Sequence, residues 1–259
     1  MFPVGDFLRT RTTPFVNYTL IAINVAVFVY MLTLDTRPSE QLVGGVVISE
    51  VERFYFDWGF VPACIGEYFG LDPDVSTRAL QQVCPPGDRE LVQPVTSMFL
   101  HAGWAHILGN MVFLWVFGDN VEDRIGHLRY LLFYFVAGIA AAAAQTFMAL
   151  DKVIPAVGAS GAISGVMGAY LIMFPTAIVQ VVIFPLIFLP FFVPAVLLIG
   201  FWFVMQLFSG IAAVGQTTAG SGVAWWAHIG GFVAGAVLIW FLKGPSRRRP
   251  RMAQSLRDT

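Results

Sequence analysis

Charge is what this 259-residue chain has little of, since 12% of its residues are Asp, Glu, Lys or Arg and 57% are hydrophobic. With a mean hydropathy of +0.73, the sequence has too few charges to cover the surface of an ordinary soluble domain. It has enough apolar length for several segments of about 20 residues, the length a helix needs to cross a bilayer. The composition therefore excludes a soluble protein and predicts a multi-pass membrane protein.

The sequence also argues against two kinds of intramembrane hydrolase, and it excludes the aspartyl kind. No Asp, Glu, Lys or Arg occurs between Lys152 and Lys243, whereas an aspartyl protease inside a membrane needs two buried aspartates. A zinc protease needs two histidines four residues apart around a glutamate, but His101 and His106 are five apart without an acidic residue between them. The charge-free stretch further argues against a transporter or channel, which would use paired charges or polar groups at the midplane.

The charges that exist are unevenly placed. Residues 35–93 hold ten acidic residues and four arginines, a formal charge of −6, whereas residues 243–259 hold six basic residues and one acidic residue, a charge of +5. A basic tail beside a membrane span is expected to stay in the cytoplasm, next to anionic lipid head groups. Nucleic-acid binding is the alternative for such a tail, but we expect no nucleic-acid partner because the tail lacks aromatic residues and directly follows a span.

Cysteine is scarce as well, and the two that occur, Cys64 and Cys84, both lie in the acidic segment. If this segment is external, it lies in an oxidising compartment, where the pair is expected to close a short loop as a disulfide. Two unpaired thiols are the alternative, because the sequence does not report the distance between the two Cα atoms.

Hydrophobic runs predict an all-α bundle of six transmembrane helices with both termini in the cytoplasm. The predicted spans are residues 14–34, 101–118, 128–149, 159–175, 192–210 and 223–242. The stretch 177–212 is ambiguous, because it is apolar throughout but three prolines interrupt its first half. One span is favoured there, because six spans return the basic tail to the side of Arg9 and Arg11, in agreement with the positive-inside rule.

The predicted organisation has three parts. A cytoplasmic segment, residues 1–13, precedes a membrane domain, residues 14–242, which includes the long external loop 35–93. Residues 243–259 form the basic cytoplasmic tail. We expect an integral, multi-pass protein of a prokaryotic plasma (inner) membrane, surrounded by the lipid bilayer.

Polar side chains of the predicted spans gather at one depth. His101 and His106 begin the second span, Ser160 begins the fourth and His228 begins the sixth. With the N-terminus inside, these three spans all run from outside to inside, so their beginnings share a level just below the outer surface. Asn110 lies one turn after His106 on the same helix face. Groups of this kind are costly in hydrocarbon, so each needs a partner or a function.

Glycines predict that the fourth and sixth spans approach each other closely. Small-residue stripes are expected beside Ser160 on one span and beside His228 on the other: Gly161, Gly165 and Gly168, and Gly231 and Gly235. Facing glycine stripes let two helix backbones come close together. Close approach is what a side chain as short as serine needs to reach an imidazole on a neighbouring helix.

These residue types indicate nucleophilic catalysis. Serine is a weak nucleophile until a base takes its proton, and a neutral His228 could do so and then protonate a leaving amine. The side chains of Asn110 and His106, with the helix beginning at Ser160, could donate hydrogen bonds to an oxyanion. The predicted spans place no carboxylate at this depth to orient His228, so a dyad is favoured over a triad.

The motifs resemble those of the rhomboid intramembrane serine proteases in order and spacing. The matching segments are His101–Asn110 (HAGWAHILGN), Gly118–Glu122 (GDNVE), Gly158–Gly161 (GASG) and Ala227–Gly235 (AHIGGFVAG). The resemblance covers residues 94–242 and implies a serine endopeptidase that cleaves transmembrane segments near the outer face, without metal or cofactor. Its partners would be single-span or polytopic membrane protein substrates, cut at small residues in helix-destabilising surroundings.

The resemblance also implies roles for single residues. Ser160 looks like the nucleophile, His228 like the general base, and His106 with Asn110 like the oxyanion donors. The positions that look structural or supporting are His101, Gly158, Gly161, Glu122, Gly231 and Gly235. For Glu122, at the cytoplasmic end, the residues also allow a cap or an ion pair with Arg124 or Arg129, and His127 is assigned no role.

Two departures from the family pattern concern the pocket and the first loop. Ser164 stands where some members carry a tyrosine, one turn after the nucleophile, that packs on the base. The first loop has Trp58 and Gly59 in place of a Trp-Arg pair. The alternative function is a non-catalytic rhomboid-like protein that binds or escorts membrane clients. Such relatives usually lack the serine or the base, and this chain has both.

Overall fold

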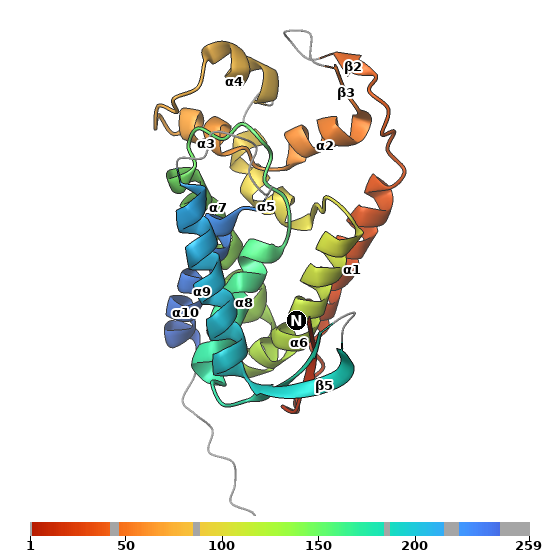
Figure 1. The fold of residues 1–259 in the computed structure, drawn as a ribbon, viewed down its shortest axis with the longest axis vertical. Coiled ribbons are helices and arrows are strands. Elements are labelled where there is room, and N and C mark those ends of the chain that lie inside the picture. The colour runs from red at the N-terminus through yellow and green to blue at the C-terminus, as the bar shows by residue number, and fades with distance from the viewer. Residues whose placement is uncertain (1, 42–46, 85–88, 184–186, 215–222, 244–259) are drawn as a thin grey trace, which may run out of the picture.

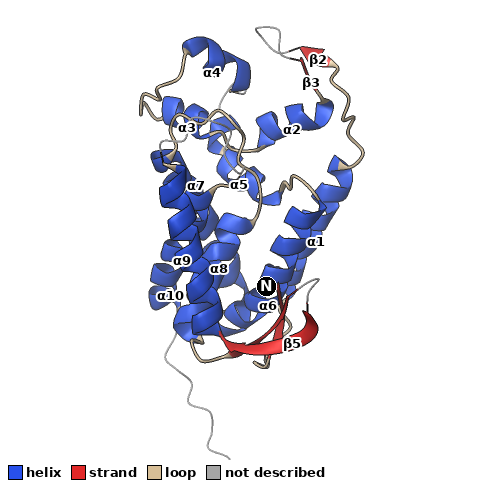
Figure 2. Cartoon of the chain, viewed as in Figure 1, coloured by secondary structure: helices blue, strands red, loops and turns tan. Residues whose placement is uncertain are grey.

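A computed structural model describes residues 2–41, 47–84, 89–183, 187–214 and 223–243. Within these residues the chain is mostly helical, and each of the six predicted spans overlaps one long helix (Figures 1 and 2). These helices are α1 (Phe15–Met31), α6 (Trp104–Ile125), α7 (His127–Met148), α8 (Ser160–Met173), α9 (Ala195–Ala213) and α10 (Trp225–Leu242). The basic tail after Lys243 and Pro185 of the ambiguous stretch lie outside the described residues.

Length and composition allow three of the described helices, α7, α9 and α10, to cross a membrane. A fourth candidate is α6 taken together with the segment Gln93–Phe99, which precedes it at a bend of 96°. Helices α1 and α8 are apolar but shorter, at 17 and 14 residues. A mostly helical membrane protein therefore agrees with the prediction, whereas six crossings and cytoplasmic termini stay a prediction.

The all-α prediction is wrong at one end of the molecule, where a sheet arches below the helices (Figure 2). Strands β1 (Phe2–Asp6), β4 (Ile178–Ile183) and β5 (Ile187–Pro194) pair antiparallel in the order β1-β4-β5. Pro190 and Pro194 lie on the edge strand β5, where a missing backbone N–H is tolerated. The ambiguous stretch is therefore a hairpin followed by one helix, as the choice of a single span requires.

Asp6 at the end of β1 ties the N-terminal strand to two helices. Its carboxylate accepts hydrogen bonds from Oη of Tyr170 at 2.5 Å and from Nδ2 of Asn120 at 3.0 Å. Burial raises the pKa of this carboxyl group. Part of the segment 1–13 thus packs against the helical domain through α6 and α8.

Glu122 joins the end of α6 to the beginning of α1. Its fully buried carboxylate accepts hydrogen bonds from the backbone N–H groups of Val16 at 3.1 Å and Asn17 at 2.7 Å. A carboxyl group at this place satisfies N–H groups that the first turn of α1 leaves unpaired. Nδ1 of His127, to which the sequence assigned no role, lies 2.5 Å from the same carboxylate.

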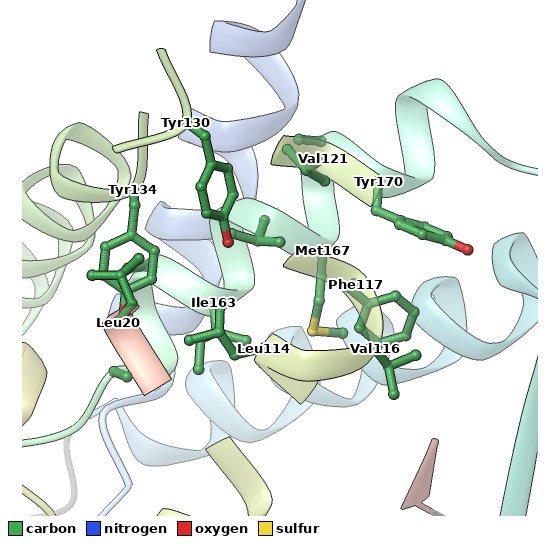
Figure 3. Packing of buried hydrophobic residues seen from close by; sticks show 14 of the residues in the cluster. Leu20, Leu114, Val116, Phe117, Val121, Tyr130, Tyr134, Ile163, Met167 and Tyr170 are labelled. Atoms are coloured by element: carbon green, nitrogen blue, oxygen red, sulfur yellow. The ribbon is translucent and has the colours of Figure 1, made fainter. Parts of the chain in front are cut away.

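Apolar side chains from α1, α6, α7 and α8 fill the centre of the bundle (Figure 3). Leu20 of α1, Phe117 of α6, Tyr134 of α7 and Met167 of α8 belong to this one cluster, and each is at most 2% exposed. Burial on this scale fixes how the four helices pack, because a close-packed core tolerates few changes in side-chain volume. The four helices are therefore held in one arrangement relative to one another.

The end of the bundle opposite the sheet is covered by short elements of the acidic segment and of the residues that directly follow it (Figure 1). These are β2 (Glu40–Gln41), β3 (Val47–Ile48), α2 (Glu50–Trp58), α3 (Pro62–Tyr68), α4 (Thr77–Val83), η1 (Arg89–Leu91), α5 (Gln93–Thr96) and η2 (Ser97–Phe99). A disulfide joins Cys64 of α3 to Cys84, which follows α4. Helix α2 begins with a capping box, in which the side chains of Ser49 and Glu52 each accept a hydrogen bond from the other's backbone N–H.

Helices α8 and α10 pack with their backbones in direct contact. A Cβ atom added to Gly165 would lie 2.6 Å from Cβ of Ala137 and 3.0 Å from the carbonyl oxygen of Gly231. One added to Gly235 would overlap the backbone of Gly165, and one added to Gly231 would overlap the carbonyl of Gly161. Because a hydrogen atom is all that fits at these positions, the glycines set the distance between the two helices.

We expect Gly235→Ala to separate α8 from α10 and to lower the free energy of unfolding by about 1–3 kcal/mol, the usual cost of overpacking. Thermal unfolding in detergent measures the effect. Gly200→Ala in α9 is the matched control, because an added Cβ meets nothing within 4 Å there and alanine favours a helix over glycine by about 1 kcal/mol. Equal melting temperatures for the two variants would contradict the packing described here.

Candidate active site

Three helices begin at one end of the bundle and carry the polar side chains that the sequence singles out. Ser160 is the first residue of α8, and His228 lies in the first turn of α10. His106 and Asn110 occupy the first two turns of α6. The close contact of α8 with α10 brings the first pair together, with Oγ of Ser160 2.8 Å from Nε2 of His228.

Gly158 brings the α6 side chains next to the residues before Ser160. Its φ of +123° favours glycine, and its N–H donates to the carbonyl of Ser97 at 2.8 Å. A Cβ atom at this position would lie 2.7 Å from Nε2 of His106 and 3.5 Å from Nδ2 of Asn110. Both side chains therefore lie against the backbone that leads into Ser160.

The side-chain amide of Asn110 has an N–H group available to donate a hydrogen bond. Among the described residues, its Nδ2 atom has no hydrogen-bond partner although it is buried. This N–H group is therefore available to a hydrogen-bond acceptor that enters the site. An oxyanion formed at Ser160 is a group of this kind.

His101 lies behind His106 and not at the surface. It is fully buried, and the centroids of the two imidazole rings are 5.0 Å apart in an edge-to-face arrangement. Its carbonyl oxygen accepts a hydrogen bond from Oη of Tyr55 at 3.2 Å. His101 therefore links helix α2 of the acidic segment to the ring of His106.

Two glutamines hold the beginning of α10, and sequence reasoning missed both. Oε1 of Gln206, in α9, lies 2.8 Å from Nδ1 of His228. Oε1 of Gln145, in α7, accepts a hydrogen bond from the backbone N–H of Ala227 at 3.1 Å. Gln206 lies in the almost entirely apolar helix α9, and Gln145 directly follows a run of alanines near the end of α7. In such surroundings an uncharged polar group needs a partner. That placement was the signal in the sequence.

Aromatic rings surround His228 from positions other than the one expected of the family. Ser164 donates its hydroxyl to the carbonyl of Ser160 at 2.6 Å within α8. The ring centroids of Trp202 and Trp225 lie 6.0 and 6.3 Å from that of His228. Tryptophans of α9 and α10 therefore occupy the surroundings of the imidazole in this chain.

A small cavity of about 30 Å³ lies beside Ser160. Side chains with little or no volume make up much of its wall, among them Gly138, Ala141, Ala142 and Ala227. Met98 and Phe60 also line it. The space next to the hydroxyl is therefore small.

The Rhomboid domain family model matches residues 88–245, which contain all of these polar side chains. "RHOMBOID-like protein 6, mitochondrial" of Arabidopsis thaliana is 31% identical over 169 residues, 62% of this chain and 52% of the relative. "Rhomboid protein 1, mitochondrial" of Saccharomyces cerevisiae is 29% identical over 62% of this chain and 45% of its own. "Rhomboid protease GluP" of Bacillus subtilis is 42% identical over 77 residues, 30% of this chain and 15% of its own.

The match thus spans about half the length of the first two relatives. The family model, however, matches more than half of this chain, and it includes the starts of α6, α8 and α10 together with the contact between α8 and α10. The residues that the family model matches thus include those that build the site. The chain belongs to the rhomboid family.

Proposed function

We propose that this protein is an intramembrane serine endopeptidase that cleaves transmembrane segments of other membrane proteins with a Ser160–His228 dyad. The observation that carries the proposal is the 2.8 Å separation of Oγ of Ser160 and Nε2 of His228, at the point where two tightly packed helices begin. This distance lies within the reach required of a nucleophile and its base. Membership of a family that includes a named protease supports it.

Each group in the site has one part in the reaction. Nε2 of His228 takes the hydroxyl proton of Ser160 while Oγ attacks the scissile carbonyl carbon, and the carbonyl π electrons move onto its oxygen. When the tetrahedral intermediate collapses, the C–N bond breaks and the protonated imidazole gives its proton to the leaving amine. Water, deprotonated by the same imidazole, then hydrolyses the acyl-serine and restores both residues.

The oxyanion that forms in these steps would be stabilised by Asn110 and His106. Nδ2 of Asn110 is buried, has no hydrogen-bond partner in the part of the chain that the structure describes, and lies near the backbone of Gly158, two residues before the nucleophile. Preorganised donors of this kind act strongly in a site from which water is excluded. The N–H groups of the first turn of α8 add further donors at the same place.

We propose further that all six helices cross the bilayer and that the site lies near the outer face. The end of the bundle that holds β1 also holds arginines of the N-terminal segment, of the last turn of α6 and of the first turn of α7: Arg9, Arg11, Arg124 and Arg129. The backbone N–H of Arg11 donates to Asp123 at 3.0 Å, which puts these segments side by side. The opposite end carries the acidic segment 35–93, so the positive-inside rule supports this orientation.

The substrates that fit the site are membrane proteins with a small residue at the cleaved bond. Glycine and alanine make up much of the wall of the small cavity beside Ser160, with Met98 and Phe60, so a methyl or hydroxymethyl group fits it better than a large side chain. The apolar helices indicate that the protein is located in a membrane. A prokaryotic plasma membrane stays our proposal, which the Bacillus relative favours and the two mitochondrial relatives oppose.

Purified protein offered a transmembrane substrate with alanine at the cleaved position should cleave it, and Ser160→Ala and His228→Ala should each abolish cleavage. Removing either group leaves no activated nucleophile. Gel assay of the products measures the effect, and melting temperatures check that both variants fold. Ser164→Ala removes a hydroxyl from the same helix and should retain activity. Unchanged cleavage by Ser160→Ala would refute the dyad, and no cleavage by the intact protein would favour the client-binding alternative.

Asn110→Ala should lower kcat about 100-fold or more, the typical cost of losing one oxyanion donor. Because Nδ2 of Asn110 has no partner in the described structure, the melting temperature of the variant should stay close to that of the intact protein. Steady-state kinetics and thermal unfolding measure the two quantities separately. A variant that keeps its kcat would remove Asn110 from the proposed mechanism.

A further inference from the structure

Gln206 is a buried polar side chain in a helix made almost entirely of apolar residues. Between Ala195 and Ala213 the sequence reads AVLLIGFWFVMQLFSGIAA, and the side chain of Gln206 is 7% exposed. Much of the rest of α9 faces outward, as the exposed Leu197, Phe201 and Phe208 show. A neutral amide held inward at this position is costly unless it is satisfied.

The carbonyl oxygen of this amide has the ring of His228 as its partner. Oε1 of Gln206 lies 2.8 Å from Nδ1 of His228, while Nε2 of the same ring lies 2.8 Å from Oγ of Ser160. Gly210, one turn further along α9, lies close to α10, since a Cβ added there would meet Cδ1 of Ile229 at 3.1 Å. The two helices are thus near enough for the amide to reach the imidazole directly.

This contact decides which ring nitrogen carries the proton. A carbonyl oxygen accepts hydrogen bonds and cannot donate them, so Nδ1 must carry the hydrogen when it bonds Oε1. Nε2 of the neutral ring is then an acceptor, which is the state needed to take the proton of Ser160. The opposite tautomer would place a hydrogen on Nε2 and leave the serine without a base.

We propose that Gln206 is a positioning residue that completes the dyad from α9 by accepting a hydrogen bond from Nδ1–H of His228. The amide oxygen fixes the tautomer and the plane of the imidazole, and it stabilises the imidazolium that forms when Nε2 takes the serine proton. A neutral acceptor performs in this chain the task that a carboxylate performs in a Ser-His-Asp triad. The inference rests on the proposed function, because it concerns the base of the same reaction.

Among the described residues, the other neighbours of the His228 ring do not select which of its nitrogens is protonated. Ser164, one turn after the nucleophile, bonds the carbonyl of Ser160. Trp202 and Trp225 approach the imidazole with ring centroids 6.0 and 6.3 Å away, which packs the ring without selecting a protonated nitrogen. An acceptor at Nδ1 favours the tautomer with the hydrogen on Nδ1, and among the described residues Oε1 of Gln206 is the acceptor that lies there.

Kinetics of three variants separate positioning from packing. Gln206→Leu keeps the volume but removes the acceptor, and kcat should fall about 10- to 100-fold with KM within about twofold of the intact protein. Gln206→Glu restores an oxygen at the same reach and should recover most of kcat. Gln180→Leu makes the same chemical change in β4, at the other end of the molecule, and should leave kcat unchanged. A kcat for Gln206→Leu equal to that of the intact protein would overturn the proposal.

Nitrogen-15 NMR of histidine-labelled protein reads the tautomer directly, and the His228→Ala spectrum identifies the signals of His228. The intact, full-length protein at neutral pH should show a protonated Nδ1 and an unprotonated Nε2, and Gln206→Leu should lose this preference. A protonated Nε2 in the intact protein overturns the proposal without reference to any variant.

The two levels of the argument fail differently. If Ser160→Ala retains cleavage, the proposed function itself fails. If Ser160→Ala is inactive while Gln206→Leu keeps full kcat, the function stands and the role of Gln206 alone is rejected.

Discussion

The close contact of α8 with α10 is the constraint on which the rest of the site depends. A serine side chain reaches about one bond beyond its Cβ, so it meets an imidazole on a neighbouring helix only if the two backbones nearly touch. Gly165 and Gly235 allow this approach, because neither position has room for a Cβ atom. The hydrogen-bonding distance between Ser160 and His228 is therefore a consequence of packing, set by residues that take no part in chemistry.

Much of this arrangement could be predicted from the sequence because the cost of burying polar groups in hydrocarbon leaves a clear pattern. His106, Asn110, Ser160 and His228 stand out against long apolar runs, and the alternation of spans assigns them to one level. The glycine stripes indicated which helices approach closely. The structure brings these residues to one end of the bundle, with Gly158 between the α6 side chains and the nucleophile.

The parts that could not be predicted depend on contacts between distant segments. The apolar stretch that begins at residue 177 is rich in β-branched residues and prolines, a pattern compatible with both helix and strand. Its first part forms a strand because β4 pairs with the N-terminal β1. Gln206 escaped notice because one amide in a helix carries no motif, and its meaning comes from the partner on α10. The same holds for His127, whose role follows from the carboxylate of Glu122 and the beginning of α1.

Labelling of the intact protein in detergent with a fluorophosphonate probe, followed by mass-spectrometric mapping of the modified residue, tests the central claim most directly. The reagent reacts with a serine whose hydroxyl is activated by a neighbouring base. The account predicts that Ser160 alone carries the phosphonate, and that labelling disappears when His228 is replaced by alanine. Modification of a different serine, or labelling that persists without His228, would contradict it.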